Sequence, residues 1–383
     1  MKQTRTVAVV TGSRAEFGLL RPVMHAIESS PRLRLKVIAG GAHLLSPAHT
    51  IREVEAEFAI VAKVPMQVAG RAARVADAIA LGRGVQGFAR AFERIKPDWV
   101  VVLGDRIEAF AAASAASVAG IAVAHIHGGD RAEGIADEAM RHAITKLSHL
   151  HLAATEQSAE RIVRMGEPPE FVHVVGSPAI DGLRGINSMS DDDARELGDP
   201  RIVALLHPTG LDLTSETRIA RAVASIASAH PTLWLAPNHD PGRETIEAVR
   251  TGASGRGAPA QWETLDHLPR PEFIALLKRL AEVRGVLVGN SSAGLIEAAA
   301  LGVRVVNIGP RQDGRERTGN VADIKLKSLD TLAAAAMRAR SASRLQPSQT
   351  YGDGRAGERI VKLLARTCLD PRSPALLRKR NAY

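Results

Sequence analysis

The sequence predicts an α/β protein made of two doubly wound, Rossmann-like domains. Short, nearly continuous aliphatic runs recur along the chain, and each is followed by a glycine, proline or polar turn and then by a helical pattern. Parallel strands covered by helices on both faces show such continuous apolar runs. The chain of 383 residues exceeds the usual size of one hydrophobic core, which favours two domains.

The predicted strands form two series along the chain. The first series lies in residues 6–14, 35–41, 99–106, 121–129, 150–156 and 171–178. The second series lies in residues 201–208, 232–240, 285–292 and 303–310. These series predict a domain over residues 1–184 and a second over residues 200–366. Residues 367–383 follow as a helical tail, whose basic residues near its end suit the helix dipole.

The segment between the two domains, residues 184–200, loses the apolar periodicity and gains Gly, Ser and Asp, so we expect a linker there. Within it, Ser190 and Asp193 have the spacing of a capping box, which predicts a short helix. Residues 251–260, "TGASGRGAPA", have the composition of a flexible surface loop.

Composition restricts the classes of protein to consider. The formal net charge is +9, but the basic residues are spread among acids and aromatic residues make up only 3% of the chain, so we expect no nucleic-acid partner. An anionic small substrate fits the charge better. No apolar run has the roughly 20 residues that a membrane span needs. The single cysteine, Cys368, excludes an internal disulfide framework, and we expect a soluble protein of the cytoplasm.

The polar residues of interest all follow predicted strands. In open parallel sheets, ligands bind beyond the carboxyl ends of the strands. We therefore expect one cleft between the domains to be faced by Arg14, Asp105, Asp130, His207, Asn238 and Ser291.

Two segments have the character of anion-binding helix starts. In "TGSRAEFGLL", Gly12 permits a tight turn and Arg14 adds a guanidinium that can bind two phosphate oxygens; an ordinary strand-to-helix turn is the alternative. In "GNSSAGLIEAAALG", Asn290, Ser291 and Ser292 offer polar groups at a helix start, and Glu297 can accept hydrogen bonds from a ribose diol. Together they favour a nucleotide diphosphate, although serines are also common N-caps.

The loop "RQDGRERTGN" carries Arg311, Arg315 and Arg317 after a strand end. We weigh diphosphate contacts from these arginines against a solvated loop. Asp105 follows a buried strand directly and is either a helix N-cap or a catalytic carboxylate, with Arg106 and Glu108 as its supports.

The segment "HIHGGDRAEGIADEAMRH" begins with His125 and His127, a pair that can bind a metal ion at a strand end with Asp130. Alternate strand positions share a face, however, so the two rings can also point together into a cleft or core. No further histidine or carboxylate cluster with ligand spacing accompanies them, and we expect no metal. The remaining polar residues for chemistry are Asp130, Asp137, Glu138, Arg141 and His142.

Taken together, these segments resemble the UDP-N-acetylglucosamine 2-epimerases, in particular the hydrolysing branch that releases free N-acetylmannosamine. The resemblance covers nearly the whole chain, through "TGSRAEFGLLRP", "GDRIEA", "HIHGGD", "DEAMRHAITKLSHLH", "VGSPAID", "PNHDPGR", "GNSSAGLIEAAALGV", "NIGPRQDGR" and "YGDGRAGERIVKLL". It implies the GT-B arrangement of two Rossmann-like domains, a UDP-sugar substrate, neither a metal nor a nicotinamide cofactor, and a homodimer.

Carried over position by position, the resemblance implies catalytic roles for Asp105, Asp130, Asp137 and His207. His207 and Arg14 would line the leaving diphosphate. The expected substrate and nucleotide contacts are Gly12, Arg14, Asn238, Asn290, Ser291, Ser292, Gly294, Glu297, Arg311 and Arg315.

The chain departs from many hydrolysing relatives, which have Glu at position 130, Asp-Tyr at Glu16 and Phe17, and Ser at Ala293. These departures leave the sugar open between UDP-N-acetylglucosamine and UDP- or GDP-linked diacetamido sugars on routes to sialic acid or other nonulosonic acids. Three other functions also stay open: a nonhydrolysing epimerase, a GT-B glycosyltransferase and a noncatalytic nucleotide-sugar sensor.

Overall fold

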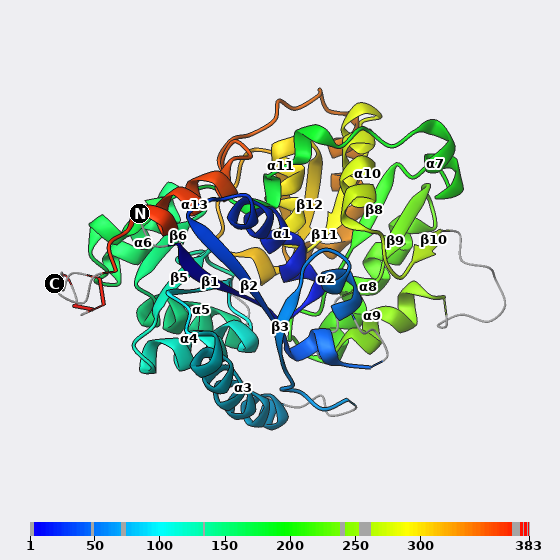
Figure 1. The fold of residues 1–383 in the computed structure, drawn as a ribbon. Helices are drawn as coiled ribbons and strands as arrows, with labels where there is room; N and C mark the ends of the chain where they lie inside the picture. The colour runs from blue at the N-terminus through cyan, green and yellow to red at the C-terminus, as the bar shows by residue number, and fades with distance from the viewer. Residues whose placement is uncertain are drawn as a thin grey trace. The chain divides into compact units, whose positions relative to one another are not determined.

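The computed structural model describes residues 4–46, 50–69, 74–132, 135–237, 242–252 and 262–369, together with residues 376, 377, 379, 380 and 382. The chain divides into two units (Figure 1). The first consists of Met1–Asp130, Ala136–Asp181 and Gly352–Tyr383, and the second of Arg131–Ile135 and Gly182–Tyr351.

The described part of the first unit contains a seven-stranded parallel sheet in the order β3-β2-β1-β4-β5-β6-β7. Its strands are β1 (Arg5–Thr11), β2 (Leu33–Gly40), β3 (Ile60–Val64), β4 (Trp99–Leu103), β5 (Ala122–Ile126), β6 (Leu150–Ala153) and β7 (Val172–Val174). Its helices are α1 (Arg14–Glu28), α2 (Ile51–Glu55), α3 (Arg74–Ile95), α4 (Ile107–Val118), α5 (Ile135–Leu147), α6 (Glu156–Arg164) and α13 (Ala356–Arg366).

The described part of the second unit contains a six-stranded parallel sheet in the order β10-β9-β8-β11-β12-β13. Its strands are β8 (Ile202–Leu205), β9 (Thr232–Leu235), β10 (Glu263–Leu265), β11 (Val286–Gly289), β12 (Arg304–Ile308) and β13 (Val321–Ile324). Its helices are α7 (Asp191–Glu196), α8 (Leu213–Ala227), α9 (Arg243–Arg250), α10 (Arg270–Glu282), α11 (Glu297–Leu301) and α12 (Leu332–Ser341). The two doubly wound folds are thus confirmed. So is the short linker helix, α7, because the side chain of its N-cap Ser190 accepts a hydrogen bond from Asp193 N.

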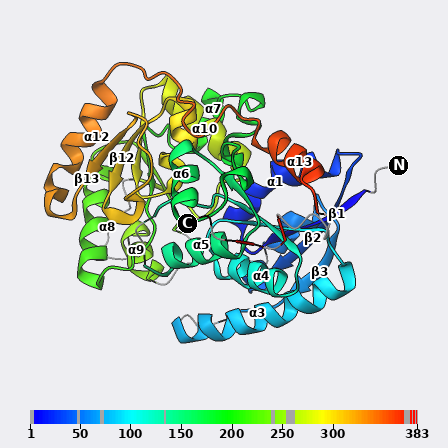
Figure 2. The same cartoon turned by 90° about the vertical axis from the view of Figure 1, so that its left-hand side faces the viewer.

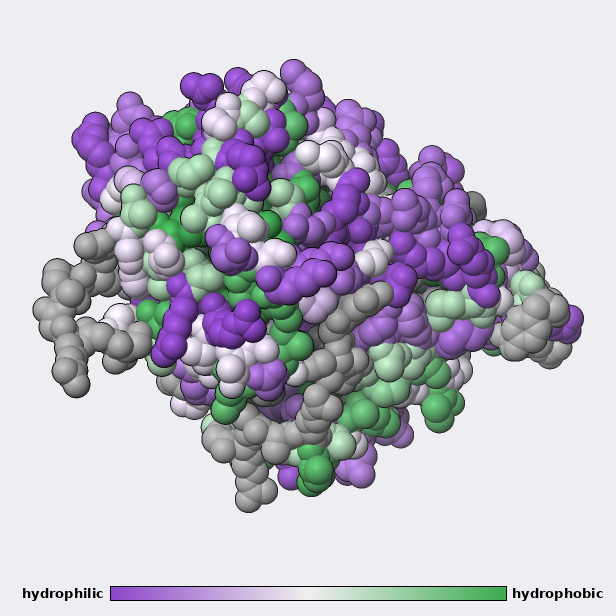
Figure 3. All heavy atoms as spheres, turned by 180° about the vertical axis from the view of Figure 1, so that it is seen from behind, coloured by the Kyte–Doolittle hydropathy of each residue, from purple (hydrophilic) through white to green (hydrophobic). Residues whose placement is uncertain are grey.

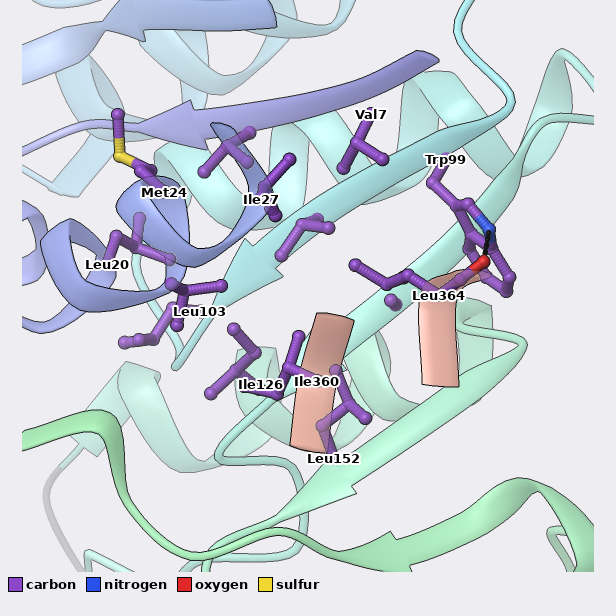
Figure 4. Close-up of a cluster of buried hydrophobic side chains, with 14 of the residues drawn as sticks. Val7, Leu20, Met24, Ile27, Trp99, Leu103, Ile126, Leu152, Ile360 and Leu364 are labelled. Atoms are coloured by element: carbon purple, nitrogen blue, oxygen red, sulfur yellow. Dashed lines mark hydrogen bonds between the residues drawn. The ribbon is translucent and has the colours of Figure 1, made fainter. Parts of the chain in front are cut away.

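Helix α13 lies in the first unit, whereas we expected residues up to 366 in the second. Its apolar face explains this placement. Ile360 and Leu364 are fully buried in the core of the first unit, and Trp99 of β4 donates its Nε1 hydrogen to Leu364 O at 3.2 Å (Figure 4). Asp181 also caps the helix, since its carboxylate accepts hydrogen bonds from the first two backbone N–H groups of α13 at 3.0 and 2.7 Å. Figure 2 shows α13 beside α1.

The strands β3, β10 and β13 were not among the predicted runs. Each is an edge strand, and each exposes or half-exposes several of its residues, so it has no continuous apolar stretch. In β3, for example, the exposed Lys63 separates the buried Ala62 and Val64. Exposed charge is common on sheet edges, where it hinders pairing with another chain.

Hydrophilic residues predominate on the face shown in Figure 3, with hydrophobic ones scattered among them. None of the described helices is long and apolar enough to span a bilayer. Nine of the 17 residues of the predicted tail at 367–383, and eight of the ten in the predicted loop at 251–260, lie outside the described residues.

Candidate active site

The strand order of each sheet reverses at a point flanked by predicted site residues. In the first unit the reversal lies between β1, which leads to Gly12 and Arg14, and β4, which leads to Asp105. In the second unit it lies between β8, which leads to His207, and β11, which leads to Asn290. Ligands of open parallel sheets bind at such switch points. Each unit therefore carries its own group of candidate residues at one sheet edge, and a cleft common to both groups stays a prediction.

Arg14 is the first residue of α1, and Ser13 is the N-cap of this helix, accepting a hydrogen bond from Glu16 N at 3.4 Å. The guanidinium of Arg14 is half-buried and makes no hydrogen bond or ion pair with the described residues. Burial lowers its pKa, and the nearby charge of Glu53 opposes that shift. A partly desolvated guanidinium at a helix start can bind an anion.

A pair of buried carboxyl groups lies behind this loop. Glu16 accepts a hydrogen bond from Gly12 N at 2.6 Å, and burial, aided by the charge of Glu108, raises the pKa of Glu16 to about 8. Glu108 of α4 accepts hydrogen bonds from Ala42 N at 3.2 Å and from Gln67 Nε2 at 2.8 Å. It thus connects the segments that follow β2 and β3.

The side chain of Glu108 also explains the glycine at position 12. A Cβ on Gly12 would lie 2.5 Å from both Cβ and Cγ of Glu108, which is too close for any real contact. Backbone and carboxyl group therefore pack directly together at the end of β1.

Asp105 forms an ion pair with Arg141 of α5. The carboxylate keeps 20% of its side-chain surface exposed, whereas the guanidinium is buried. Arg141 Nη1 also donates to His127 O at 3.3 Å. The arrangement leaves Asp105 as an accessible carboxylate whose position is determined by a buried cation.

His125 and His127 have different surroundings. His125 is fully buried at the end of β5; its Nε2 donates to Gly104 O at 2.7 Å, and burial lowers its pKa to about 3. His127 has φ +63°, a left-handed conformation rare for residues with a side chain. Its Nδ1 lies 2.7 Å from Asp130 Oδ2, and its Nε2 lies 2.9 Å from Ser177 Oγ.

Asp130 is 2% exposed and completes this network, because its other oxygen accepts a hydrogen bond from Ser158 Oγ at 2.8 Å. The two histidines thus do not converge on one point, since the ring nitrogens of His127 face Asp130 and Ser177 while His125 faces the Gly104 carbonyl. Within the described residues, no group of three or more His, Cys, Asp or Glu side chains is placed to hold a metal ion.

Two predicted residues, the side chain of Asp137 and the whole of Asn238, lie outside the described residues. Next to Asp137 in sequence, Glu138 Oε1 lies within hydrogen-bonding distance, 3.2 Å, of His142 Nε2.

In the second unit, Asn290 lies next to the backbone of His207. Its side chain accepts from His207 N and donates to His207 O, both at 2.8 Å. The His207 ring is buried, and burial, followed by the charge of Arg311, lowers its pKa well below the usual value. The buried Asn290 amide therefore joins the ends of β8 and β11, and the His207 imidazole is neutral.

The serine-rich turn after β11 is a short 3₁₀ helix, Ser292–Gly294, and Ser291 is its N-cap, with the side chain accepting from Ala293 N at 3.4 Å. Ser291 and Ser292 are half-exposed. Gly294 is buried, and a Cβ there would lie 2.9 Å from Val305 Cγ1. Glu297 is 5% exposed and accepts a hydrogen bond from Arg270 Nη1 at 3.0 Å.

The three arginines of the following loop differ in their partners. Arg311 donates to Asn290 O at 3.2 Å, which places it beside the serine turn. Arg315 donates to Arg131 O at 3.0 Å. Arg317 forms a two-pronged pair with Asp323, at 3.0 Å for each contact, and is therefore a structural residue.

Several residues of the site were missed by the sequence reasoning. Ser158 and Ser177 hold the ends of the His127–Asp130 pair, and Arg270 holds Glu297. The only signal was that Ser177 belongs to the segment "VGSPAID". Partners 28 or 50 residues away leave no local pattern.

Comparison with known proteins places the chain among nucleotide-sugar enzymes. A family model described as UDP-N-acetylglucosamine 2-epimerase matches residues 25–365. The chain is 37% identical to a UDP-N,N'-diacetylbacillosamine 2-epimerase (hydrolyzing) of Legionella pneumophila, over 99% of this chain and all of the relative. It is 32% identical to a UDP-N-acetylglucosamine 2-epimerase of Neisseria meningitidis serogroup B, over 81% of each chain. Among solved structures, the S. aureus protein MnaA in a co-structure with UDP has a TM-score of 0.78 at 19% identity, covering 99% of this chain and 100% of that one.

Proposed function

The chain belongs to the UDP-N-acetylglucosamine 2-epimerase family, and on that premise we propose that it is a hydrolysing nucleotide-sugar 2-epimerase. It converts a UDP-linked 2-acetamido sugar and water to UDP and the free sugar with inverted configuration at C2. The observation that carries this proposal is the 37% identity, over the full length of both chains, to a relative named as hydrolyzing.

The reaction proceeds by elimination and then hydration. In the first step the bond between C1 and the diphosphate oxygen breaks, and its electron pair leaves with UDP. A base takes the C2 proton, and a C1–C2 double bond forms. In the second step an acid protonates C2 on the opposite face, while water adds its oxygen to C1 and gives up a proton. Carboxylates stabilise the positive charge that develops at C1, and they also carry out the proton transfers at C2.

The geometry supports different roles for the acids in this proposal. Asp105 is partly exposed and held by Arg141, which suits a group that touches the sugar. We keep Asp137 as the second acid on the family resemblance. Asp130 is buried, with its oxygens facing His127 and Ser158, so we assign it a positioning role through His127.

The proposal assigns the diphosphate and the nucleoside to different groups of residues. The guanidinium of Arg14, which makes no hydrogen bond to the described residues, is assigned to the leaving diphosphate. The turn at Gly12 is assigned to the same group. Ser291, Ser292 and Arg311, together with the neutral ring of His207, are assigned to the nucleotide, and Glu297 to the ribose. Asn290 supports them through its bonds to His207. Asn238, Gly294 and Arg315 remain in the proposed binding set.

The substrate is a UDP-sugar with an acetamido group at C2, a feature common to the named substrates of the relatives at 37% and 32% identity. A diacetamido sugar accords with the first of them. N-acetylglucosamine, which would yield free N-acetylmannosamine for sialic acid synthesis, accords with the second. We also propose that the enzyme works in the cytoplasm, as a homodimer.

Product analysis tests the proposal. The protein is incubated separately with UDP-N,N'-diacetylbacillosamine and with UDP-N-acetylglucosamine, in heavy water enriched in oxygen-18 and with EDTA present. We expect UDP and a free, C2-inverted sugar that carries deuterium at C2 and, at early times, the heavy oxygen at C1. An intact UDP-sugar with deuterium at C2 would indicate a nonhydrolysing epimerase instead. A free sugar that keeps its C2 hydrogen would indicate simple hydrolysis.

A further inference from the structure

The last residues of the chain dock onto the first unit at three described points. Leu376 is 3% exposed within the core cluster that contains Trp99. Lys379 lies among the residues that follow α5 and α6. Ala382 N donates to Gly166 O at 2.8 Å.

Lys379 lies at the C-terminal end of α5. Its ammonium group donates to Thr145 O at 3.2 Å and to Ser148 O. The last carbonyl groups of a helix have no partner within the helix, and a cation there also interacts favourably with the helix dipole. Ser148 already donates its N–H to Thr145 O and its hydroxyl to Ile144 O, and Lys379 adds a charged donor from the tail to this end of α5.

The same ammonium group lies 2.6 Å from Glu167 Oε2. Glu167 is 1% exposed, and it also contacts Lys146 at 2.6 Å and His151 at 3.0 Å. These contacts lower the pKa of Glu167 to about 2, although burial alone would raise it. Without Lys379, Glu167 would keep two partners, but the carbonyl groups of Thr145 and Ser148 would lose this donor.

Helix α5 connects this cluster to the candidate active site. In the last turn of α5, Thr145 Oγ1 lies 3.2 Å from His125 Nδ1 and donates to Arg141 O at 3.0 Å. His125 in turn holds the carbonyl of Gly104, the residue before Asp105. Arg141 pairs with Asp105 itself.

We propose that Lys379 is a positioning residue for the reaction: by capping α5 from the C-terminal tail, it holds Arg141 and His125 where they orient Asp105. The inference rests on the proposed function for its catalytic part. Its structural part, the capping of α5, can be measured without any substrate.

The test compares Lys379→Met, which keeps the length of the side chain but not the charge, with Lys379→Arg, which keeps the charge. Arg380→Met is the matched control, because Arg380 is the next residue and is exposed. Each full-length variant is examined by hydrogen–deuterium exchange of the α5 amides, by calorimetry with UDP, and by steady-state turnover below the temperature at which any of them unfolds.

We expect Lys379→Met to exchange faster at the end of α5 and to lose about ten-fold or more in kcat, with UDP affinity within about two-fold of wild type. Lys379→Arg should recover most of both properties, and Arg380→Met should match wild type. Unchanged exchange in Lys379→Met would overturn the capping role. Faster exchange with unchanged kcat would overturn the catalytic role. A wild-type protein that turns over none of the UDP-sugars would count against the proposed function, while the exchange measurement would still decide the capping.

Discussion

The side chain of Asn290 binds the backbone of His207 twice, with its oxygen accepting from His207 N and its nitrogen donating to His207 O, each at 2.8 Å. The amide is fully buried, so both hydrogen bonds are shielded from water. This pair joins the ends of β8 and β11, the two strands between which the order of the second sheet reverses.

Asn290→Ala should therefore destabilise the second unit. Each lost buried hydrogen bond costs about 0.5–1.5 kcal/mol, and this change removes two of them from His207. Urea unfolding followed by circular dichroism should show a lower midpoint. Ser291→Ala is the matched control, because Ser291 is half-exposed and caps only one N–H group. Equal midpoints for the two variants would contradict the role assigned to Asn290.

The buried Glu16 should make stability depend on pH. The pKa of Glu16 is about 8 in the folded chain, whereas an ordinary Glu side chain has a pKa of 4.5. Between these two pH values the folded chain therefore holds a proton that the unfolded chain has released. The contribution of Glu16 to the free energy of unfolding is thus full below about pH 4.5 and is lost as the pH rises through 8. Within this window the slope approaches roughly 1.4 kcal/mol per pH unit.

Glu16→Gln should flatten that part of the profile and unfold at higher urea than wild type at pH 8. Burial is the main cause of the shift, and the groups that act on Glu16 are the backbone amides of Gly12 and Ser13 and the charges of Glu108 and Arg106. Urea midpoints measured from pH 5 to 9 check the prediction. Parallel profiles for the two proteins would show that Glu16 does not bind this proton.

Arg14 and Asp105 flank the point at which the strand order of the first sheet reverses. Substitution of Arg14 should affect UDP binding, whereas substitution of Asp105 should affect turnover. Arg14→Ala should weaken UDP binding about ten-fold to over a hundred-fold, the value of a charged hydrogen bond to phosphate. Folding stability should change little, because Arg14 has no hydrogen bond to the described part of the protein. Asp105→Asn should keep UDP affinity and lose turnover. Calorimetry and a coupled assay for released UDP measure the two effects, and a normal UDP affinity in Arg14→Ala would refute the assignment.

The central parts of the fold were predictable from the sequence because β1, β4 and β5 are buried along most of their length. The edge strands β3, β10 and β13 were not, since a strand with an exposed face shares its pattern with loops and helices. The placement of α13 was missed for another reason. The sequence shows an apolar helical face but does not show which of the two cores receives it.

The candidate site divides in the same way. Residues that follow a buried strand, such as Asp105 and Asn290, were found because strand ends are visible in the sequence. Their partners were not, since Arg141 lies 36 residues from Asp105 and His207 lies 83 residues from Asn290. The left-handed backbone of His127 also had no signal, because such conformations are uncommon in every residue that has a side chain.

The buried pair of Asp130 and His127 makes a prediction that separates acid chemistry from positioning. Asp130 accepts hydrogen bonds from two donors, Ser158 Oγ at 2.8 Å and His127 Nδ1 at 2.7 Å. In Asp130→Asn the amide has one acceptor oxygen and one donor group, so one of the two donors loses its acceptor.

We expect Asp130→Asn to reduce kcat about ten-fold to a hundred-fold, in proportion to one lost hydrogen bond to a charged group, while UDP affinity stays near that of wild type. Ser177→Ala is a second probe, because it removes only the partner on the other side of the His127 ring. It should lower kcat in the same direction by less. If Asp130 itself donated or accepted the C2 proton, Asp130→Asn would abolish deuterium incorporation at C2 altogether, whereas a positioning residue leaves a slow reaction that still inserts the label.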